Sequence, residues 1–126
     1  MPFIEVKTSR VLEEEVKDQI AADLAEAIEL VPMKRGDGFE ICFTDGADLR
    51  MGTRKLENGA YLSLAYFLPI TDETLDTLNA EFFRIIRERL QIRDEDVYIT
   101  YREVQDWGVF GKCMHKEKFL KEFMNQ

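Results

Sequence analysis

The chain has 126 residues and a formal net charge of −8, from 17 basic and 25 acidic side chains. This length allows one domain with a hydrophobic core but not two, and the acidic balance argues against a nucleic-acid binder, which needs a basic face to neutralise phosphates. The chain contains no apolar run of about 18 residues that would span a membrane, and its start lacks the charged and apolar regions of a signal peptide.

The first half of the chain predicts a β-α-β unit. Residues 3–8 alternate between two faces, as a half-buried strand does. Residues 12–31 carry apolar side chains at spacings of three and four, and glutamates occupy the first turn of the helix that this pattern predicts. Pro32 and the two glycines that follow it end the helix, and residues 39–43 alternate again as a second strand.

The second half repeats this order after a polar, glycine-containing loop. Residues 61–68 form the third predicted strand, which Pro69 ends. Thr71 caps a second helix, whose apolar stripe reaches Leu90. Residues 96–104 are the closing strand, so the chain reads β-α-β, loop, β-α-β.

Two such units predict an α/β (α+β) fold. The simplest assembly is a four-stranded mixed sheet with both helices on one face, because each unit needs a right-handed crossover between parallel strands. The other face is expected to carry Phe and Tyr side chains from several strands. Since a large apolar patch is rarely left in water, we expect the chain to oligomerise through this sheet.

Residues 113–126 form a tail behind the repeated units. Its apolar side chains recur at helical spacing among lysines and glutamates: Phe119, Leu120, Phe123 and Met124. This pattern predicts a short amphipathic helix that packs on its own or a neighbouring subunit. The expected division is a domain over residues 1–112 and an amphipathic tail over residues 113–126.

Several segments together resemble a known family. The start MPFIEV, the doubled β-α-β pattern over residues 1–104 and the segment RERLQIRDEDVYITYREV are similar to the tautomerase superfamily, most closely its branch related to macrophage migration inhibitory factor and phenylpyruvate tautomerase. DWGVFGK follows where the family has an aromatic- and glycine-rich segment. The resemblance covers residues 1–112 and implies a symmetric, barrel-like homotrimer with an active site at each subunit boundary, built around the N-terminal proline.

The chemistry expected of Pro2 depends on Met1. If Met1 is removed, Pro2 becomes an N-terminal secondary amine; if Met1 is retained, Pro2 is an imide with no proton to exchange. Enolisation of a 2-keto acid needs a base that removes a proton beside the carbonyl and returns it elsewhere. Burial and nearby cations lower an amine pKa toward neutrality, while the enolate needs a donor and the carboxylate a cation.

The resemblance assigns roles to particular residues. Pro2 is the catalytic acid and base, and Tyr98 of a neighbouring subunit donates a hydrogen bond to the substrate oxygen. Lys34 binds the substrate carboxylate and helps keep the proline amine neutral. The other implied substrate-binding residues are Phe67, through its main-chain groups, Thr100, where the family branch often has asparagine, and Trp107 and Phe110, in the wall of the hydrophobic pocket.

These residues also have purely structural interpretations. Lys34 precedes Arg35, and a solvated basic pair after a helix is common. Tyr98 alternates with apolar neighbours and is equally interpreted as a packed interface tyrosine. Trp107 and Phe110 are equally interpreted as a cover for the end of the barrel.

The implied function is a keto-enol tautomerase, an isomerase without metal or cofactor, acting in the cytoplasm on phenylpyruvate or another 2-keto acid. Cys42 and Cys113 form no CxxC pair or metal-ligand cluster, which indicates reduced thiols. One alternative is a non-catalytic trimeric module of the same fold that binds a ligand or partner. Another is hydration, dehalogenation or decarboxylation by the same proline.

Overall fold

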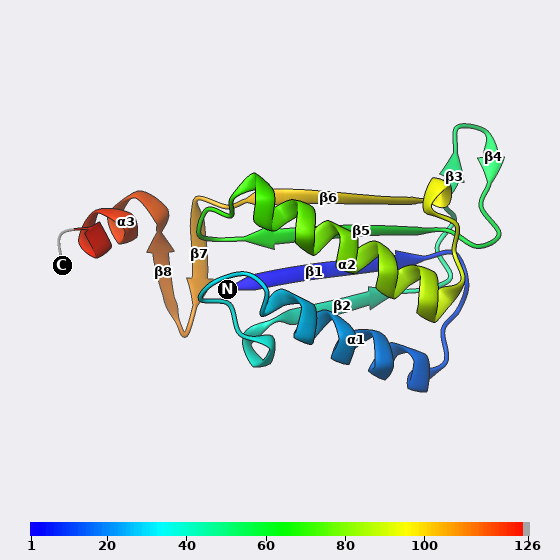
Figure 1. Ribbon diagram of the computed structural model, residues 1–126, viewed down its shortest axis with the longest axis horizontal. Coiled ribbons are helices and arrows are strands. Elements are labelled where there is room, and N and C mark those ends of the chain that lie inside the picture. Colours follow the sequence, from blue (N-terminus) through cyan, green and yellow to red (C-terminus); the bar gives the residue numbers. More distant parts are fainter. Residues whose placement is uncertain (125–126) are drawn as a thin grey trace.

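Two long helices lie side by side across one face of a four-stranded sheet in the computed structural model, which describes residues 1–124 (Figure 1). The elements of these two layers are β1 (Pro2–Thr8), α1 (Glu14–Ile28), β2 (Glu40–Thr44), β5 (Ala60–Tyr66), α2 (Asp72–Leu90) and β6 (Val97–Glu103). The strand order is β2-β1-β5-β6, with β1 parallel to β2 and antiparallel to β5, and with β5 parallel to β6. The predicted mixed sheet with both helices on one face is confirmed. The Met124 side chain and residues 125–126, which end the predicted tail, lie outside the described part.

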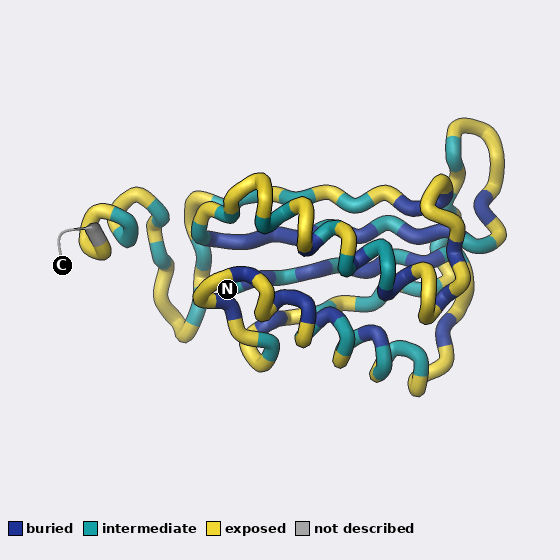
Figure 2. Tube along the Cα trace, in the orientation of Figure 1, coloured by how far each residue is buried: buried dark blue, intermediate teal, exposed yellow. Residues whose placement is uncertain are grey.

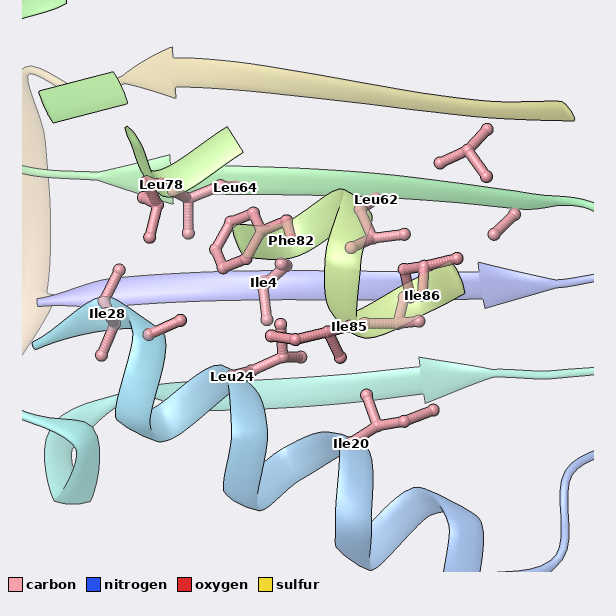
Figure 3. Close-up of a cluster of buried hydrophobic side chains, with 14 of the residues drawn as sticks. Ile4, Ile20, Leu24, Ile28, Leu62, Leu64, Leu78, Phe82, Ile85 and Ile86 are labelled. Atoms are coloured by element: carbon pink, nitrogen blue, oxygen red, sulfur yellow. The ribbon is translucent and has the colours of Figure 1, made fainter. Parts of the chain in front are cut away.

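The hydrophobic core fills the space between the helices and the sheet. Figure 3 shows isoleucine, leucine and phenylalanine side chains of α1, α2, β1 and β5 gathered there. The fully buried members include Ile4, Ile20, Leu24, Ile28, Leu62, Leu64, Leu78, Phe82, Ile85 and Ile86. Burying one such side chain contributes about 1.5–3 kcal/mol relative to leaving it exposed. Figure 2 shows the complementary pattern, with exposed segments along the outer sides of both helices.

The observed ends of the helices agree better with local capping signals than with the extent of the apolar spacing. α2 begins after Thr71, whose hydroxyl accepts a hydrogen bond from the Thr74 N–H at 3.2 Å and so satisfies one free donor of the first turn. α1 is shorter than the predicted segment 12–31. Leu12 and Val31 lie just beyond its ends yet are buried, so the apolar spacing continues into the flanking loops.

The structure contains two antiparallel ribbons that the residue pattern does not predict. One lies in the central loop, and the other lies at the end of the sheet where β1 begins, so that β7 crosses that end (Figure 1). The remaining elements are η1 (Gly36–Gly38), β3 (Arg50–Met51), β4 (Arg54–Lys55), η2 (Asp94–Asp96), β7 (Asp106–Val109), β8 (Lys112–His115) and α3 (Lys116–Met124). The predicted tail helix is therefore present, but a strand precedes it.

The tail helix α3 packs against the same chain. The Phe119 ring lies edge-on to the Phe67 ring just after β5, with centroids 5.9 Å apart. Lys116 forms an ion pair with Glu103 at the end of β6. Within the described residues, no helix is both long and apolar enough to cross a bilayer.

The sheet face opposite the helices is only partly aromatic. Phe3, Tyr61 and Tyr98 lie on it, as the alternation predicts. Most of the other positions are not aromatic or large and apolar: Glu5, Lys7, Glu40, Cys42, Thr44, Ser63, Ala65, Thr100 and Arg102. The face of a single chain is therefore accessible to water, and its few aromatic side chains, among them the cross-strand neighbours Tyr61 and Tyr98, lie among polar ones.

Candidate functional site around Pro2

Pro2 is the first residue of a central strand. It is buried and pairs across the sheet with Tyr66 of β5, which in turn pairs with Glu103 of β6. Because β1 lies inside the sheet, neighbouring strands flank its first residue on both sides. β7 crosses the end of the sheet at the same place (Figure 1), so the N-terminal end of β1 is enclosed more than a usual chain terminus.

A hollow of about 470 Å³ opens beside Pro2. Phe3 and Ala65 contribute to its lining from neighbouring positions of β1 and β5, and Trp107 contributes from β7. An aromatic ring and small apolar groups next to the strand start fit the apolar part of a small ligand. The structure thus brings Trp107 to Pro2, as the resemblance implies.

Phe110 lies elsewhere. It is 95% exposed at the turn between β7 and β8, with a φ of 52°, and it lines a neighbouring hollow of about 390 Å³. Met1 and Val109 line both hollows. In a single chain, Phe110 therefore does not contribute to the wall beside Pro2, in contrast to Trp107.

Lys34 lies near Tyr66, the cross-strand partner of Pro2. Its side chain is largely buried, and its Nζ lies 5.9 Å from the centroid of the Tyr66 ring, within the range of a cation–π interaction. Burial lowers the pKa of Lys34 from its ordinary value, because the charged form loses hydration. The structure therefore brings Lys34 to the Pro2 end of the sheet. The interpretation of Lys34 as one of a solvated pair of basic residues is wrong, because its side chain is buried.

The loop that carries Lys34 is held against α1 by a close backbone approach. A Cβ atom placed on Gly36 would lie 2.5 Å from the carbonyl oxygen of Ala25, which no side chain tolerates without movement. The Lys34 N–H donates to the Val31 carbonyl at 3.2 Å. The absence of a side chain at Gly36 thus allows the loop to turn back and place Lys34 beside Tyr66.

The pKa of the terminal amine of Met1 depends on the electrostatic environment at this end of the sheet. Burial first, and then the positive charge of Lys34, lower the pKa of the Met1 amine below its ordinary value. An amine located one residue later, on Pro2, would be subject to the same kinds of influence.

Tyr98 and Thr100 lie on β6 but do not line this hollow. Tyr98 pairs with Tyr61, which pairs with Lys7, five positions along β1 from Pro2; this separation corresponds to roughly 17 Å. Thr100 lies with its hydroxyl 2.7 Å from the Tyr61 hydroxyl. Within one chain, neither side chain meets Pro2.

Phe67 follows β5 and is fully buried. Its ring packs against Phe119, so α3 covers it. The adjacent carbonyl of Tyr66 accepts a hydrogen bond from the Val104 N–H at 2.7 Å, which ties the ends of β5 and β6 together. The main chain around Phe67 therefore lies at the Pro2 end of the sheet.

Three residues near Pro2 were not among the sequence candidates. Tyr66 faces Pro2 across the sheet, and burial, followed by the charges of Glu103 and Asp72, raises its pKa. Glu40 and Arg102 line the hollow from the two edge strands. Alternation predicts which face these residues occupy, but only the register between strands places them beside Pro2.

A larger groove of about 630 Å³ lies between α1 and α2. Its lining includes the acidic Asp23, Glu26, Asp76 and Glu81. Arg84 is paired with Glu81 at 2.8 Å, so part of this charge is neutralised. We place the candidate site at the smaller hollow, because it has a terminal strand residue and aromatic walls and lies at the end of the sheet where the buried Lys34 contacts Tyr66.

No cluster of three or more His, Cys, Asp or Glu side chains suited to a metal ion occurs in the described part of the chain.

No protein-family model matches this sequence, and no curated protein matches it significantly. Solved structures do match. Leishmania major MIF2 aligns with a TM-score of 0.83 at 17% identity, over 90% of this chain and 97% of that chain.

Two further structures extend this likeness. Pt0534, solved after inactivation by 2-oxo-3-pentynoate, aligns with a TM-score of 0.78 at 14% identity, over 93% of this chain and 98% of that chain. A fused 4-OT, solved as a symmetric trimer, aligns with a TM-score of 0.78 at 14% identity, over 91% and 96%. The chain thus shares its fold with these solved structures and with proteins like macrophage migration inhibitory factor.

Proposed function

We propose that the chain is a keto-enol tautomerase that acts on a 2-keto acid such as phenylpyruvate. The observation that carries this proposal is the place of Pro2, which is buried at the start of a central strand beside a hollow partly lined by Trp107. Its cross-strand partner is Tyr66, and the largely buried Lys34 lies against the Tyr66 ring. Residues 1–112 contain this site, and residues 113–126 are an appended tail. The reaction needs no metal or cofactor, because it only moves one proton.

The nitrogen of Pro2 is the acid and base of this reaction once Met1 is removed. The neutral amine takes the proton from the carbon beside the keto group, and the resulting ammonium returns a proton to the oxygen of the enolate. The reverse sequence converts the enol to the ketone. Burial and the Lys34 charge keep a usable fraction of the amine neutral at physiological pH, as they lower the pKa of the terminal amine in the described chain.

Lys34 is the partner of the substrate carboxylate in this proposal. No carboxylate of the described residues lies within ion-pair distance of its amine, so an anionic ligand would supply the missing counter-charge. The main-chain groups at Phe67 and the ring of Trp107 then contact the rest of the substrate. Trp107 favours an aryl or apolar substituent.

We further propose that the active form is a homotrimer in which Tyr98 and Thr100 of one chain complete the site of its neighbour. Tyr98 is 64% exposed and lies far from Pro2 of its own chain, which supports a role across a subunit boundary. Phe110, 95% exposed at its turn, would enter the pocket wall in the same way. The fused 4-OT with this fold is a trimer in its solved structure.

Two further observations support parts of this proposal. Pt0534, which shares the fold, is inactivated by 2-oxo-3-pentynoate, a 2-keto acid. Cys42 and Cys113 are free and exposed, which suits a reducing compartment such as the cytoplasm.

The test compares three forms of the protein in phenylpyruvate ketonisation, followed by the loss of enol absorbance. The forms are wild type with Met1 removal verified by intact mass, Pro2→Ala, and a form that retains Met1. We expect both altered forms to lose roughly 10²- to 10⁴-fold in rate, the usual value of a positioned general base. Equal rates for all three would reject the proline mechanism and favour the non-catalytic binding module.

A further inference from the structure

Tyr66 connects several parts of the candidate site. It pairs in register with Pro2 of β1 and with Glu103 of β6, so the three residues form a row across the end of the sheet where β1 begins. Tyr66 is 6% exposed, and the Lys34 ammonium lies over its ring, 5.9 Å from the centroid. An aromatic face attracts a cation more strongly where water is excluded, so this ring is suited to hold the lysine in place.

The ring is also the partner that the Lys34 ammonium has among the described residues. Within residues 1–124, the ammonium forms no ion pair with a carboxylate and no side-chain hydrogen bond. A lysine side chain has four flexible bonds, so an ammonium without a fixed contact samples many positions. The contact with Tyr66 restricts these positions before a ligand arrives, which lowers the cost of binding an anion.

The tail helix α3 contacts both neighbours of Tyr66. On the adjacent strand, Glu103 forms an ion pair with Lys116, whose side chain is only 13% exposed. Next along the chain, Phe67 is fully buried, and its ring packs against Phe119 with the two ring planes at 72°. A movement of α3 would therefore displace groups on two sides of Tyr66.

Charges from three elements act on the Tyr66 hydroxyl. Burial first, and then the charges of Glu103 on β6 and Asp72 on α2, raise the pKa of Tyr66, while Lys116 on α3 lowers it. The Lys116 N–H also donates to the Gln105 carbonyl at 2.8 Å, which fixes the start of α3 to the segment behind β6. The hydroxyl end of Tyr66 is thus directed to the place where α2, β6 and α3 meet.

We propose that Tyr66 is the positioning residue for Lys34, and that the tail helix α3 keeps Tyr66 in place through Glu103 and Phe67. This inference rests on the proposed function, in which Lys34 binds the substrate carboxylate, and it gives the appended tail a role in that binding. Neither Tyr66 nor α3 takes part in the proton transfer, and no covalent step is added.

This arrangement predicts an effect on binding more than on the chemical step. Loosening Tyr66 releases the Lys34 ammonium into water, so the substrate carboxylate loses a partner that was already in place and KM rises. Pro2 remains at the start of a strand that β2 and β5 hold on both sides, so kcat should change less than KM.

The first test observes the contact between Lys34 and Tyr66 directly. The ring current of an aromatic side chain shifts the NMR resonances of protons near its face, and the end of the Lys34 side chain lies there. We expect the shift of the Lys34 side-chain protons to be retained in Tyr66→Phe and lost in Tyr66→Leu. Two tail-side variants, Glu103→Gln and Phe119→Ala, should reduce it.

The second test measures pyruvate binding by calorimetry and phenylpyruvate ketonisation by kinetics, with the full chain after Met1 removal. We expect Tyr66→Leu to weaken pyruvate binding roughly 3- to 30-fold, the range of one partly desolvated cation–π contact, and Tyr66→Phe to restore most of it. Glu103→Gln and Phe119→Ala should fall between these two and raise KM more than they lower kcat.

The matched control is Phe123→Ala. Phe123 also lies on α3, but it is 53% exposed and stacks on Phe119. We expect the Lys34 proton shift to be unchanged in this variant and pyruvate binding to change less than about 2-fold.

Each outcome decides the inference. Losses in Tyr66→Leu, smaller losses in Glu103→Gln and Phe119→Ala, and none in Phe123→Ala support it, even if Pro2→Ala ketonises phenylpyruvate as fast as wild type and the proposed reaction fails. Unchanged shifts and unchanged pyruvate binding in both tail-side variants overturn the role of α3, even if the Pro2 mechanism holds. Equal losses in Phe119→Ala and Phe123→Ala indicate a general loss of stability and overturn it as well, as does a wild type that binds no pyruvate.

Discussion

The amine of Lys34 lies 5.9 Å from the centre of the Tyr66 ring, and Tyr66 is the residue that pairs with Pro2 across the sheet. This relationship brings a buried cation and an apolar ring to the start of β1. The burial of this end of the sheet and the charge of Lys34 disfavour a second positive charge nearby, because burial removes hydration and the lysine repels another ammonium. A free amine on Pro2 would therefore remain neutral at a lower pH than an exposed terminal amine.

The first prediction concerns the pH dependence of catalysis. The neutral amine is the active base, so kcat/KM should rise with pH through the pKa of the Pro2 amine. Lys34→Met removes a positive charge that lowers this pKa but retains an apolar side chain. We therefore expect the acid limb of the profile to move to higher pH, together with a higher KM for the substrate acid. An unchanged profile in Lys34→Met would contradict the assigned role of Lys34.

The second prediction concerns the loop that positions Lys34. Gly36→Ala places a Cβ atom 2.5 Å from the Ala25 carbonyl oxygen, so the loop must shift away from α1. We expect a loss of about 1–3 kcal/mol in the free energy of unfolding and a higher KM. Gly38→Ala is the matched control, because its added Cβ meets no atom within 4 Å. Urea denaturation that gives equal stabilities for the two variants would reject this account.

The third prediction concerns assembly. If the sheet face with Phe3, Tyr61 and Tyr98 is covered by other copies, the protein should be a homotrimer at micromolar concentration. Light scattering should then give three times the chain mass of 14.8 kDa. A monomer at this concentration would reject both the trimer and any site shared between subunits.

The fourth prediction concerns Tyr98 and tests whether sites are shared. Pro2→Ala and Tyr98→Phe should each lower kcat, the second more mildly. Mixing the two variants under conditions that exchange subunits should raise activity above the average of the separate proteins, because some sites then combine an intact Pro2 with an intact Tyr98. A mixture that is no more active than the average of its parts would show that Tyr98 does not act across a boundary.

The fifth prediction concerns α3. Deleting residues 116–126 uncovers Phe67 and removes the Lys116 partner of Glu103. We expect Tm to fall by several degrees, since the loss of an aromatic contact and of buried apolar area amounts to roughly 1–3 kcal/mol. Phe119→Ala should reproduce most of this loss.

The control for the tail is Phe123→Ala. Phe123 is 53% exposed and stacks on Phe119 with ring centroids 6.4 Å apart, so its truncation should lower Tm less. A Tm that is unchanged by the deletion would mean that α3 contributes nothing to the stability of the domain.

The periodic patterns of the sequence determined the elements and the layers. Alternation in residues 3–8, 39–43, 61–68 and 96–104 predicts the four strands, and helical spacing predicts both long helices within a few residues of their ends. These signals are local, because a side chain's face follows from strand or helix geometry alone. The apolar spacing overestimates the length of α1, because Leu12 and Val31 lie in the flanking loops and are nevertheless buried in the core. Pro2, Lys34 and Trp107 were identified from the sequence by resemblance, and the fold brings all three to one end of the sheet.

Only the tertiary structure decided which other residues meet Pro2. Tyr66 lies 64 positions away in sequence and reaches Pro2 through the antiparallel register of β1 and β5. Arg102 and Glu40 reach the same hollow through the register of the edge strands. A register depends on pairings between distant segments, and a shift of one residue would turn every side chain to the opposite face. The same reason separates Tyr98 from Pro2 within one chain, although alternation alone gives no sign of that distance.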